Sequence, residues 1–370
     1  IRRLSELQQL TVLGDRVALS QQVPLAQKLK SQLLAASENM WASAHARHEL
    51  LKHVLSGGDP TVLGKLLDRK VIPEAELALA RGAFAYAVGD RQEAAEHLQN
   101  VDFLSLNPSL GGHIALVRAV LTKDADKRAA LALTDVARLL SPGTVVEETA
   151  LRLAIELSIA NGERILFERS IMRYFTRFPA SLYAEAIHAR IAGVLALTEK
   201  VGTQSGLTFL TELSAVLSPQ RRRSFYAKVA EAALRGGKLE TAEQAARLAR
   251  GNEAASDPAA TKLVAIEAAA LPFGTRRAEA LRLLDLANTT GKSSETGELI
   301  ATTRALVDMI DEPLQTAPPM GPATNVAKPA PGRPSAAEAL NARAVKVEAL
   351  TAKANASISA AEKLLAEVKK

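Results

Sequence analysis

Apolar residues recur every three to four positions along most of the chain, which predicts amphipathic α-helices rather than strands. The clearest segment, residues 77–98, reads LALARGAFAYAVGDRQEAAEHL. We expect Gly89 to end a first helix in the left-handed region and Asp90 to cap the first amides of a second. Ala94 and Leu98 then form a stripe that faces the first helix. The segment predicts a helical hairpin, which buries a single stripe and needs neighbouring copies for stability.

The hairpin pattern recurs along the chain. A small residue followed by a polar one marks each predicted corner between paired helices, at positions 58, 89, 125, 162, 202, 237 and 274. The six intervals between 58 and 274 average 36 residues, close to the roughly 34 of a tetratricopeptide repeat. Prolines at 142, 179 and 219 are expected to stop the second helix of a hairpin. The sequence therefore predicts an all-α, tetratricopeptide-like helical-hairpin solenoid, with a non-repetitive helical bundle as the alternative.

Four parts follow from this pattern and from its interruptions. We predict an N-terminal helical cap over 1–56, the repeat solenoid over 57–310, a Pro/Ala-rich linker over 311–334 and an alanine-rich C-terminal helix over 335–370. The linker is rich in proline and nearly free of large apolar residues, so it cannot bury enough surface to order itself. The last helix opens with a Ser335–Glu338 capping box and carries a weak heptad seam. It either docks on another surface or stays a largely free tail.

Three helices are predicted within the cap. The first carries a stripe of leucines at 4, 7, 10 and 13 and ends at a divergent corner, Gly14–Asp15. Pro24 is expected to open the second helix, because proline is tolerated in a first turn. The third helix is predicted to run from Trp41 to Leu55, with Trp41 as a core anchor.

Composition and charge exclude several classes of chemistry. The 370 residues contain no cysteine, so disulfides, thiolate catalysis and thiolate metal sites are excluded. The net charge is +6, but 46 basic and 40 acidic residues are interspersed as on a solvated helical surface. The one dense basic run, at 221–223, is either a solvated surface or a contact for an acidic partner or phosphate. No aromatic-lined basic stripe typical of nucleic-acid binding is present, and no apolar run is long enough to span a membrane.

Candidate sites for catalysis or metal binding are sparse. The sequence contains no phosphate-binding loop, no dinucleotide fingerprint and no nucleophile elbow. His45, His48 and His53 lie close to Glu49, but Arg47 opposes a cation there, and ordinary surface or capping histidines are the alternative to a metal site. The acidic pairs Glu147–Glu148 and Glu74/Glu76 are expected in the first turns of helices, where the helix dipole favours them. A lysozyme-like glycan-cleaving enzyme would need a sugar cleft rich in aromatics, which the sequence lacks. We therefore assign no catalytic, cofactor-binding or metal residue and leave the partner-binding residues unassigned.

Several stretches resemble a known family. They are SGGDPTVLGKLLDR (56–69), ALARGAFAYAVGDRQEAAEHL with NPSLGGHIALV (107–117), RLLSPGTVVEETALR (138–152) and RYFTRFPASLYA (173–184). Over about residues 1–310 the chain resembles the MotC family, periplasmic motility proteins of flagellated alphaproteobacteria. The resemblance implies export to the periplasm, a role in flagellar rotation and binding to the periplasmic part of the stator protein MotB. It carries no motif that would assign binding residues.

The resulting hypothesis is a non-enzymatic periplasmic scaffold, without a cofactor, that binds and stabilises or positions MotB. A generic repeat adaptor of another exported or cytosolic complex is the alternative, and the two are separated by genomic neighbourhood. Because the sequence begins with Ile1 rather than Met, we also expect an upstream segment to have been removed. This segment is either a signal peptide or residues omitted when the expressed part of the protein was chosen.

Overall fold

The computed structural model describes residues 1–198, 203–251, 258–288 and 294–311, all within one compact unit, Ile1–Glu312. Regular structure in these ranges is entirely α-helical, which confirms the predicted all-α class. Nearly all of the predicted linker and all of the predicted C-terminal helix lie outside the described residues, as does most of the predicted corner at 202.

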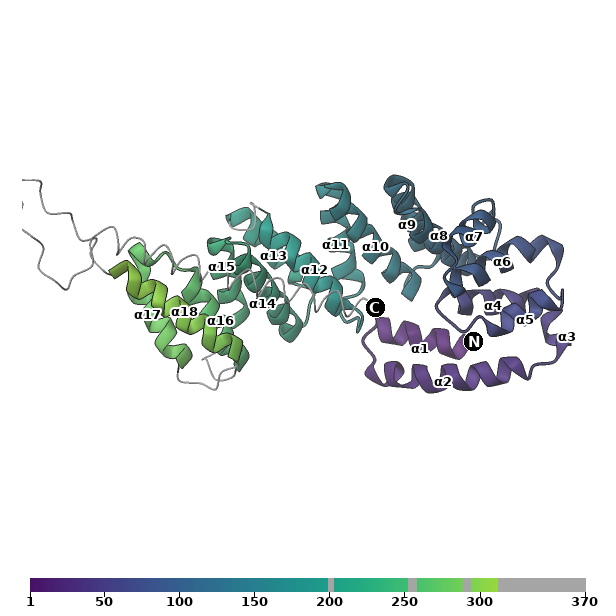
Figure 1. Ribbon diagram of the computed structural model, residues 1–370, viewed down its shortest axis with the longest axis horizontal. Coiled ribbons are helices and arrows are strands. Elements are labelled where there is room, and N and C mark those ends of the chain that lie inside the picture. The colour runs from purple at the N-terminus through teal and green to yellow at the C-terminus, as the bar shows by residue number, and fades with distance from the viewer. Residues whose placement is uncertain (199–202, 252–257, 289–293, 312–370) are drawn as a thin grey trace, which may run out of the picture. The chain divides into compact units, whose positions relative to one another are not determined.

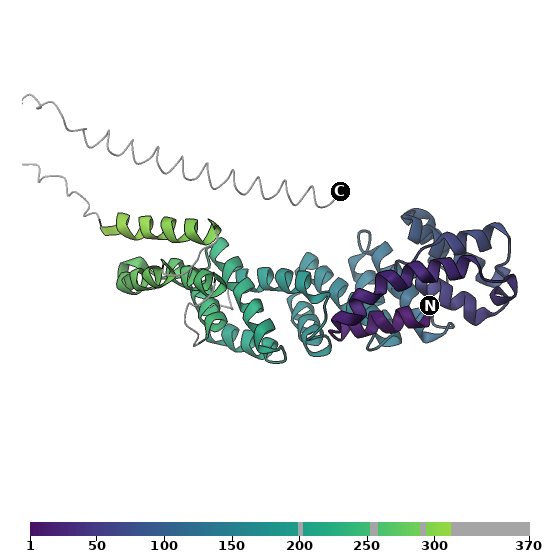
Figure 2. The ribbon, with the colours of Figure 1, turned by 90° about the horizontal axis from the view of Figure 1, so that it is seen from below.

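The helices follow one another with short connections (Figure 1). In chain order they are α1 (Arg2–Val12), α2 (Arg16–Leu34), α3 (Glu38–Trp41), α4 (Ala44–Leu55), α5 (Thr61–Asp68), α6 (Glu74–Val88), α7 (Arg91–Leu98), α8 (Pro108–Thr122), α9 (Lys127–Leu140), α10 (Val145–Asn161), α11 (Arg164–Arg177), α12 (Ala184–Leu197), α13 (Gln204–Ser214), α14 (Pro219–Arg235), α15 (Leu239–Arg250), α16 (Pro258–Ala270), α17 (Phe273–Asn288) and α18 (Ser294–Asp311). Many sequence neighbours, such as α6 and α7, α8 and α9, or α14 and α15, pack against each other, whereas α12 packs on α14 and α13 on α11. The last described helix, α18, packs on both α16 and α17 (Figure 2).

Several predicted corners lie where the sequence places them. Gly89 ends α6 with φ +90°, and the Asp90 carboxylate accepts a hydrogen bond of 2.9 Å from the Glu93 amide at the start of α7. Gly162 and Gly237, both at φ +68°, separate α10 from α11 and α14 from α15. A left-handed conformation is one that glycine adopts without the penalty of a Cβ. Local signals therefore specify these hairpins.

The predicted corner at 274 is wrong. Gly274 lies in the first turn of α17, which begins at Phe273, and the chain turns earlier, between Ala270 and Phe273. The turn contains Pro272, which disfavours helical geometry at the residue before it. The helix also has a non-helical residue close to its start, since Arg276 has φ −120° and ψ 26°.

The three prolines at predicted helix ends behave differently from one another. Pro142 and Pro179 each follow a helix end by two residues, after α9 and α11. Pro219 instead occupies the first position of α14, where a missing N–H costs nothing, and α13 has already ended at Ser214. Pro219 therefore starts a helix rather than stopping one.

The second predicted helix of the N-terminal cap begins earlier than expected. The Asp15 carboxylate accepts hydrogen bonds of 2.8 and 3.0 Å from the Val17 and Ala18 amides, so α2 starts at Arg16. Pro24 lies inside α2 instead of opening it. The Gly14–Asp15 corner itself is present, with Gly14 at φ +98°.

The leucine stripe and the third predicted helix also differ from expectation. Leu4 and Leu7 are buried, whereas Leu10 and Leu13 are 38% and 62% exposed. The third predicted helix begins only at Ala44, as α4, because Trp41 is the last residue of the separate short helix α3. There the guanidinium of Arg47 donates to the carbonyls of Trp41 and Ala42, at 2.8 and 2.9 Å.

Helices α1 and α2 form an antiparallel pair that reaches a distant part of the chain (Figure 1). Gly14, in the turn between them, packs against the backbone near α12, because a Cβ built on it would lie 2.7 Å from the Ala180 carbonyl oxygen. The amide of Leu182 donates to the Thr11 carbonyl at 3.3 Å. At the other end of α2, Lys30 forms an ion pair of 2.7 Å with Asp59. The pair therefore joins the α4–α5 connection to the loop that precedes α12.

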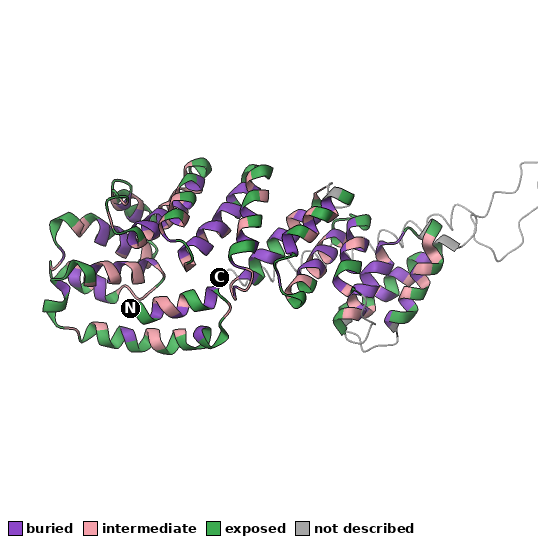
Figure 3. Ribbon diagram, turned by 180° about the vertical axis from the view of Figure 1, so that it is seen from behind, coloured by how far each residue is buried: buried purple, intermediate pink, exposed green. Residues whose placement is uncertain are grey.

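Buried residues, purple in Figure 3, occur along most of the helices, and many of the apolar ones belong to two large clusters. One joins residues of α3 to α8, including Trp41, which is 3% exposed and is confirmed as a core residue. The other joins residues from Leu151 in α10 to Ala270 in α16, and also includes Val12 of α1. By contrast, α2 buries only Ala18 and Leu29 and is exposed along most of its length.

Candidate functional site

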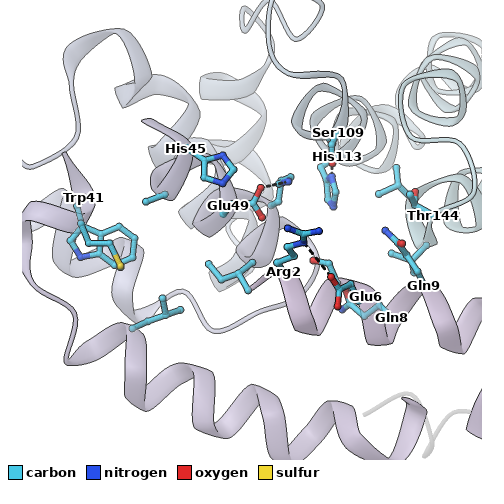
Figure 4. A pocket seen from close by; sticks show the side chains of 18 residues that line it. Arg2, Glu6, Gln8, Gln9, Trp41, His45, Glu49, Ser109, His113 and Thr144 are labelled. Atoms are coloured by element: carbon cyan, nitrogen blue, oxygen red, sulfur yellow. Dashed lines mark hydrogen bonds and ion pairs between the residues drawn. The ribbon is translucent and has the colours of Figure 1, made fainter. Parts of the chain in front are cut away.

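A large cavity of about 830 Å³ lies between α1 and the helices α4, α8 and α10. In Figure 4, Arg2, Glu6 and Gln9 of α1 face His113 of α8 and Thr144, the residue before α10. His45 and Glu49 of α4 line a further wall. The site is therefore assembled from segments more than a hundred residues apart in the chain, which no local sequence pattern could indicate.

The charged groups of this cavity pair with one another. Arg2 forms an ion pair of 3.2 Å with Glu6, one turn along α1. Lys52 forms one of 2.5 Å with Glu49 on α4. The Nδ1 atom of His113 lies 2.7 Å from the carbonyl oxygen of Ser109, and burial lowers the pKa of His113. A neutral His113 at pH 7 follows, so the cavity is polar but balanced in charge.

The histidines of α4 are not gathered around one point. His45 lines the cavity, His48 lies 3.7 Å from Glu76, and the His53 ring packs against Gly58. Burial lowers the pKa of His53. Within the described ranges, no three His, Asp or Glu residues are arranged to hold a metal ion.

Glu76 has a structural partner that the sequence analysis did not identify. Both of its carboxylate oxygens accept from Arg47, from Nη2 and from Nε, each at 2.7 Å. Arg47 is buried, and its hydrogen bond holds the pKa of Glu76 below its ordinary value. The interaction joins the start of α6 to α4. Glu76 therefore holds two helices together, in addition to its favourable position in the first turn of α6.

Glu147 and Glu148 start α10 as predicted, but both also bond to later segments. Glu147 accepts from Arg177 at 2.7 and 3.0 Å. Glu148 is fully buried and accepts from the hydroxyls of Tyr174 and Ser181, at 2.9 and 2.6 Å. Burial and the neighbouring Glu148 carboxylate strongly raise the pKa of Tyr174. These acids join α10 to α11 and to the loop that follows it.

The arginine run at 221–223 is largely structural. Arg221 donates to three carbonyls, those of Pro179, Ala180 and Ser181, at 2.8 to 3.3 Å. Arg222 likewise donates to carbonyls just after α13, including that of Ala215 at 2.8 Å. Neither guanidinium is simply a solvated surface group, because each satisfies carbonyls that have no partner within a helix.

Comparison with known proteins assigns the chain to a family. The model of the family described as "Chemotaxis protein MotC" matches residues 1–370. A curated relative, the chemotaxis protein MotC of Rhizobium meliloti (strain 1021), is 27% identical over 257 residues. That alignment covers 70% of this chain and 58% of the relative, so the chain spans little more than half of the relative's length. No solved structure matches the chain. None of the described helices is both long enough and apolar enough to cross a membrane.

Proposed function

The chain belongs to the MotC family of motility and chemotaxis proteins, and from that premise we propose that it is a periplasmic scaffold for the flagellar motor. In this proposal it binds the periplasmic part of the stator protein MotB and stabilises or positions it for rotation. The scaffold is a tetratricopeptide-like solenoid that acts by contact and catalyses no reaction.

The observation that carries the proposal is the succession of helices from α6 to α17, in which α6 and α7, α8 and α9, α10 and α11, α14 and α15, and α16 and α17 pack as pairs. Between these pairs α12 packs on α14 and α13 on α11, and α8, α10 and α12 jointly line a groove of about 530 Å³. Stacked helical hairpins characteristically bind other proteins along such surfaces. The carboxylates that could have served a catalytic site have structural roles instead. Glu76, Glu147 and Glu148 all accept hydrogen bonds from other helices or loops.

The direct test is titration calorimetry of the purified chain with the purified periplasmic part of MotB from the same bacterium. We expect saturable binding with a defined stoichiometry, and we expect loss of swimming when the gene is deleted. An unrelated periplasmic domain of similar size and charge serves as the control. Equal heat from the MotB part and from this control would refute the stator-binding proposal, and retention of the chain in the cytosol would refute the location.

A further inference from the structure

A second groove, distinct from the large cavity, is lined by α8, α10 and α12 and has a volume of about 530 Å³. We call it the basic groove and define it by Lys123, Arg152, Arg190 and Glu156, with Leu153 and Ile187 as apolar members. Three cations therefore face one anion. Leu153 and Ile187 are nearly buried, at 8% and 4% exposed, so the accessible apolar surface of the groove belongs to Val120 and Ala186, which also line it.

Arg152 is the central cation of the basic groove. Its side chain is half-buried, and its Nε atom is buried without a hydrogen-bond acceptor. Its guanidinium donates only to the neutral hydroxyl of Thr149, at 3.1 Å, and lies 6.0 Å from the centre of the Tyr183 ring. No carboxylate of the described ranges forms an ion pair with it. A desolvated arginine with free donors favours a planar anionic partner such as a carboxylate.

The other charged groups of the basic groove do not pair with one another, and, within the described ranges, Lys123 alone has an acid partner, which lies outside the groove. Arg190 is exposed and has no hydrogen bond or ion pair with any described residue. Lys123 pairs only with its exposed neighbour Asp124, at 3.2 Å. Glu156 is exposed and forms no ion pair with Arg152, although it lies one turn further along α10.

In two other large grooves of the described unit, cations pair with acids that line the same groove. In the large cavity, Arg2 and Lys52 pair with acids of the same cavity. In the groove on α14 to α16, Lys262 pairs with Glu231 at 3.1 Å. A small cleft of about 110 Å³ between α9 and α11 also has several arginines, but it is too small for a chain segment. The basic groove alone among these combines room for a peptide with two arginines, Arg152 and Arg190, that form no ion pair with a described residue.

We propose that the basic groove binds an acidic polypeptide segment that also carries apolar side chains. The carboxylates of the segment pair with Arg152, Arg190 and Lys123, and its apolar side chains cover Val120 and Ala186. This inference rests on the proposed function and deepens it, because it gives the partner's contact segment a chemical character. Complementary charge of this kind sets the specificity and the rate of association.

The test compares variants of the full chain that differ only at the basic groove. Arg190→Glu is the main variant, because an exposed residue with no partner can be replaced without loss of folding. Arg152→Gln is the second, and Glu156→Gln removes the only acid. Arg81→Glu is the matched control, since Arg81 is exposed on α6, lines none of these grooves and has no hydrogen bond or ion pair with a described residue.

Two probes are titrated against each variant. One is a fluorescent 16-residue synthetic peptide that alternates glutamate with leucine and alanine, and the other is the periplasmic part of MotB. We expect Arg190→Glu to weaken peptide binding about tenfold or more, since juxtaposed like charges oppose binding. Arg152→Gln should weaken it as well, Glu156→Gln should strengthen it, and Arg81→Glu should change it less than twofold. Raising the salt concentration should weaken it throughout.

The two probes separate this inference from the proposed function. Loss of peptide binding in Arg190→Glu but no MotB binding by the unaltered chain would support the groove and refute the stator role. MotB binding that is identical in the unaltered chain, Arg190→Glu and Arg152→Gln would overturn the groove and leave the stator role standing. The proposal is also overturned if the unaltered chain fails to bind the peptide. It is likewise overturned if Arg81→Glu weakens peptide binding as much as Arg190→Glu does.

Discussion

Arg47, Arg177 and Arg221 each bond to a group on another segment of the chain, either a carboxylate or a set of carbonyl oxygens. Their partners include Glu76 and Glu147, two acids whose sequence position suggested only a helix first turn. Removing one member of such a pair leaves the other desolvated and without a partner, which costs far more than the loss of an exposed pair. Charge at these positions therefore bears mainly on stability.

We predict that Glu76→Gln destabilises the protein by about 3 kcal/mol, because it leaves the buried guanidinium of Arg47 without its anion. The exposed pair Arg2–Glu6 gives the control, and Glu6→Gln should cost less than about 0.5 kcal/mol. Urea denaturation followed by circular dichroism measures both. Equal midpoints for the two variants would contradict the structural role of Glu76.

His188 should make stability depend on pH. It packs among Tyr174, Phe175 and Phe225, and burial lowers its pKa from 6.5 to about 4. Between these values the unfolded chain binds a proton that the folded chain does not. The contribution of His188 to stability is therefore complete above pH 6.5 and declines as the pH falls toward 4, by about 3 kcal/mol in all.

The His188→Phe variant isolates this effect, because the titrating group is removed while the aromatic packing is kept. We expect its free energy of unfolding to fall less steeply between pH 6.5 and 4 than that of the unaltered chain. Denaturation at half-unit pH steps provides the comparison. Parallel curves would show that His188 does not titrate as the structure implies.

Helices could be predicted from the sequence wherever a local signal specifies them. Gly89 with Asp90 gives a corner through backbone freedom and an amide cap, and both act within a few residues. Pro24 misled the prediction because the Asp15 cap acts first and the helix continues through the proline. The contact of the α1–α2 turn with Ala180, and the cavity beneath α1, depend on segments far apart in the chain. The spacing of apolar residues carries no information about contacts between distant segments, so the cavity beneath α1 could not be predicted.

The docking of α1 and α2 can be tested at Gly14. Gly14→Ala introduces a methyl group 2.7 Å from the Ala180 carbonyl oxygen at φ +98°, so both contact and backbone are strained. Gly89→Ala is the matched control, since Gly89 has φ +90° but no atom within 4 Å of the new Cβ. We expect faster hydrogen exchange at the Leu182 amide and along α1 only in Gly14→Ala. The same exchange pattern in both variants would argue that backbone strain alone matters.

The described unit contains two large cores, one over α3 to α8 and one over α10 to α16. The aromatic rings of Phe175 and Phe225, with centres 5.0 Å apart, lie within the second. Each core is built from helices that pack on their near neighbours, so damage in one core need not reach the other at once.

We predict that Phe175→Ala destabilises the second core by about 3–5 kcal/mol, the cost of a large buried cavity. Hydrogen exchange followed by mass spectrometry should show loss of protection from α10 to α15 first, with α4 to α6 affected less. Uniform loss across both cores would show that the unit unfolds in a single cooperative step.

The contact between the N-terminal helix pair and the loop before α12 also has a consequence during synthesis. Gln22 and Tyr183, which hydrogen-bond across it, are 161 residues apart in the chain. At a translation rate of roughly 5–20 residues per second, the first two helices wait on the order of 10–30 s for their docking surface. During that delay Val12, which belongs to the second core in the finished molecule, lacks the later residues on which it packs. A chaperone can therefore bind this early segment of the nascent chain, and the chaperone must release it once the later helices have emerged.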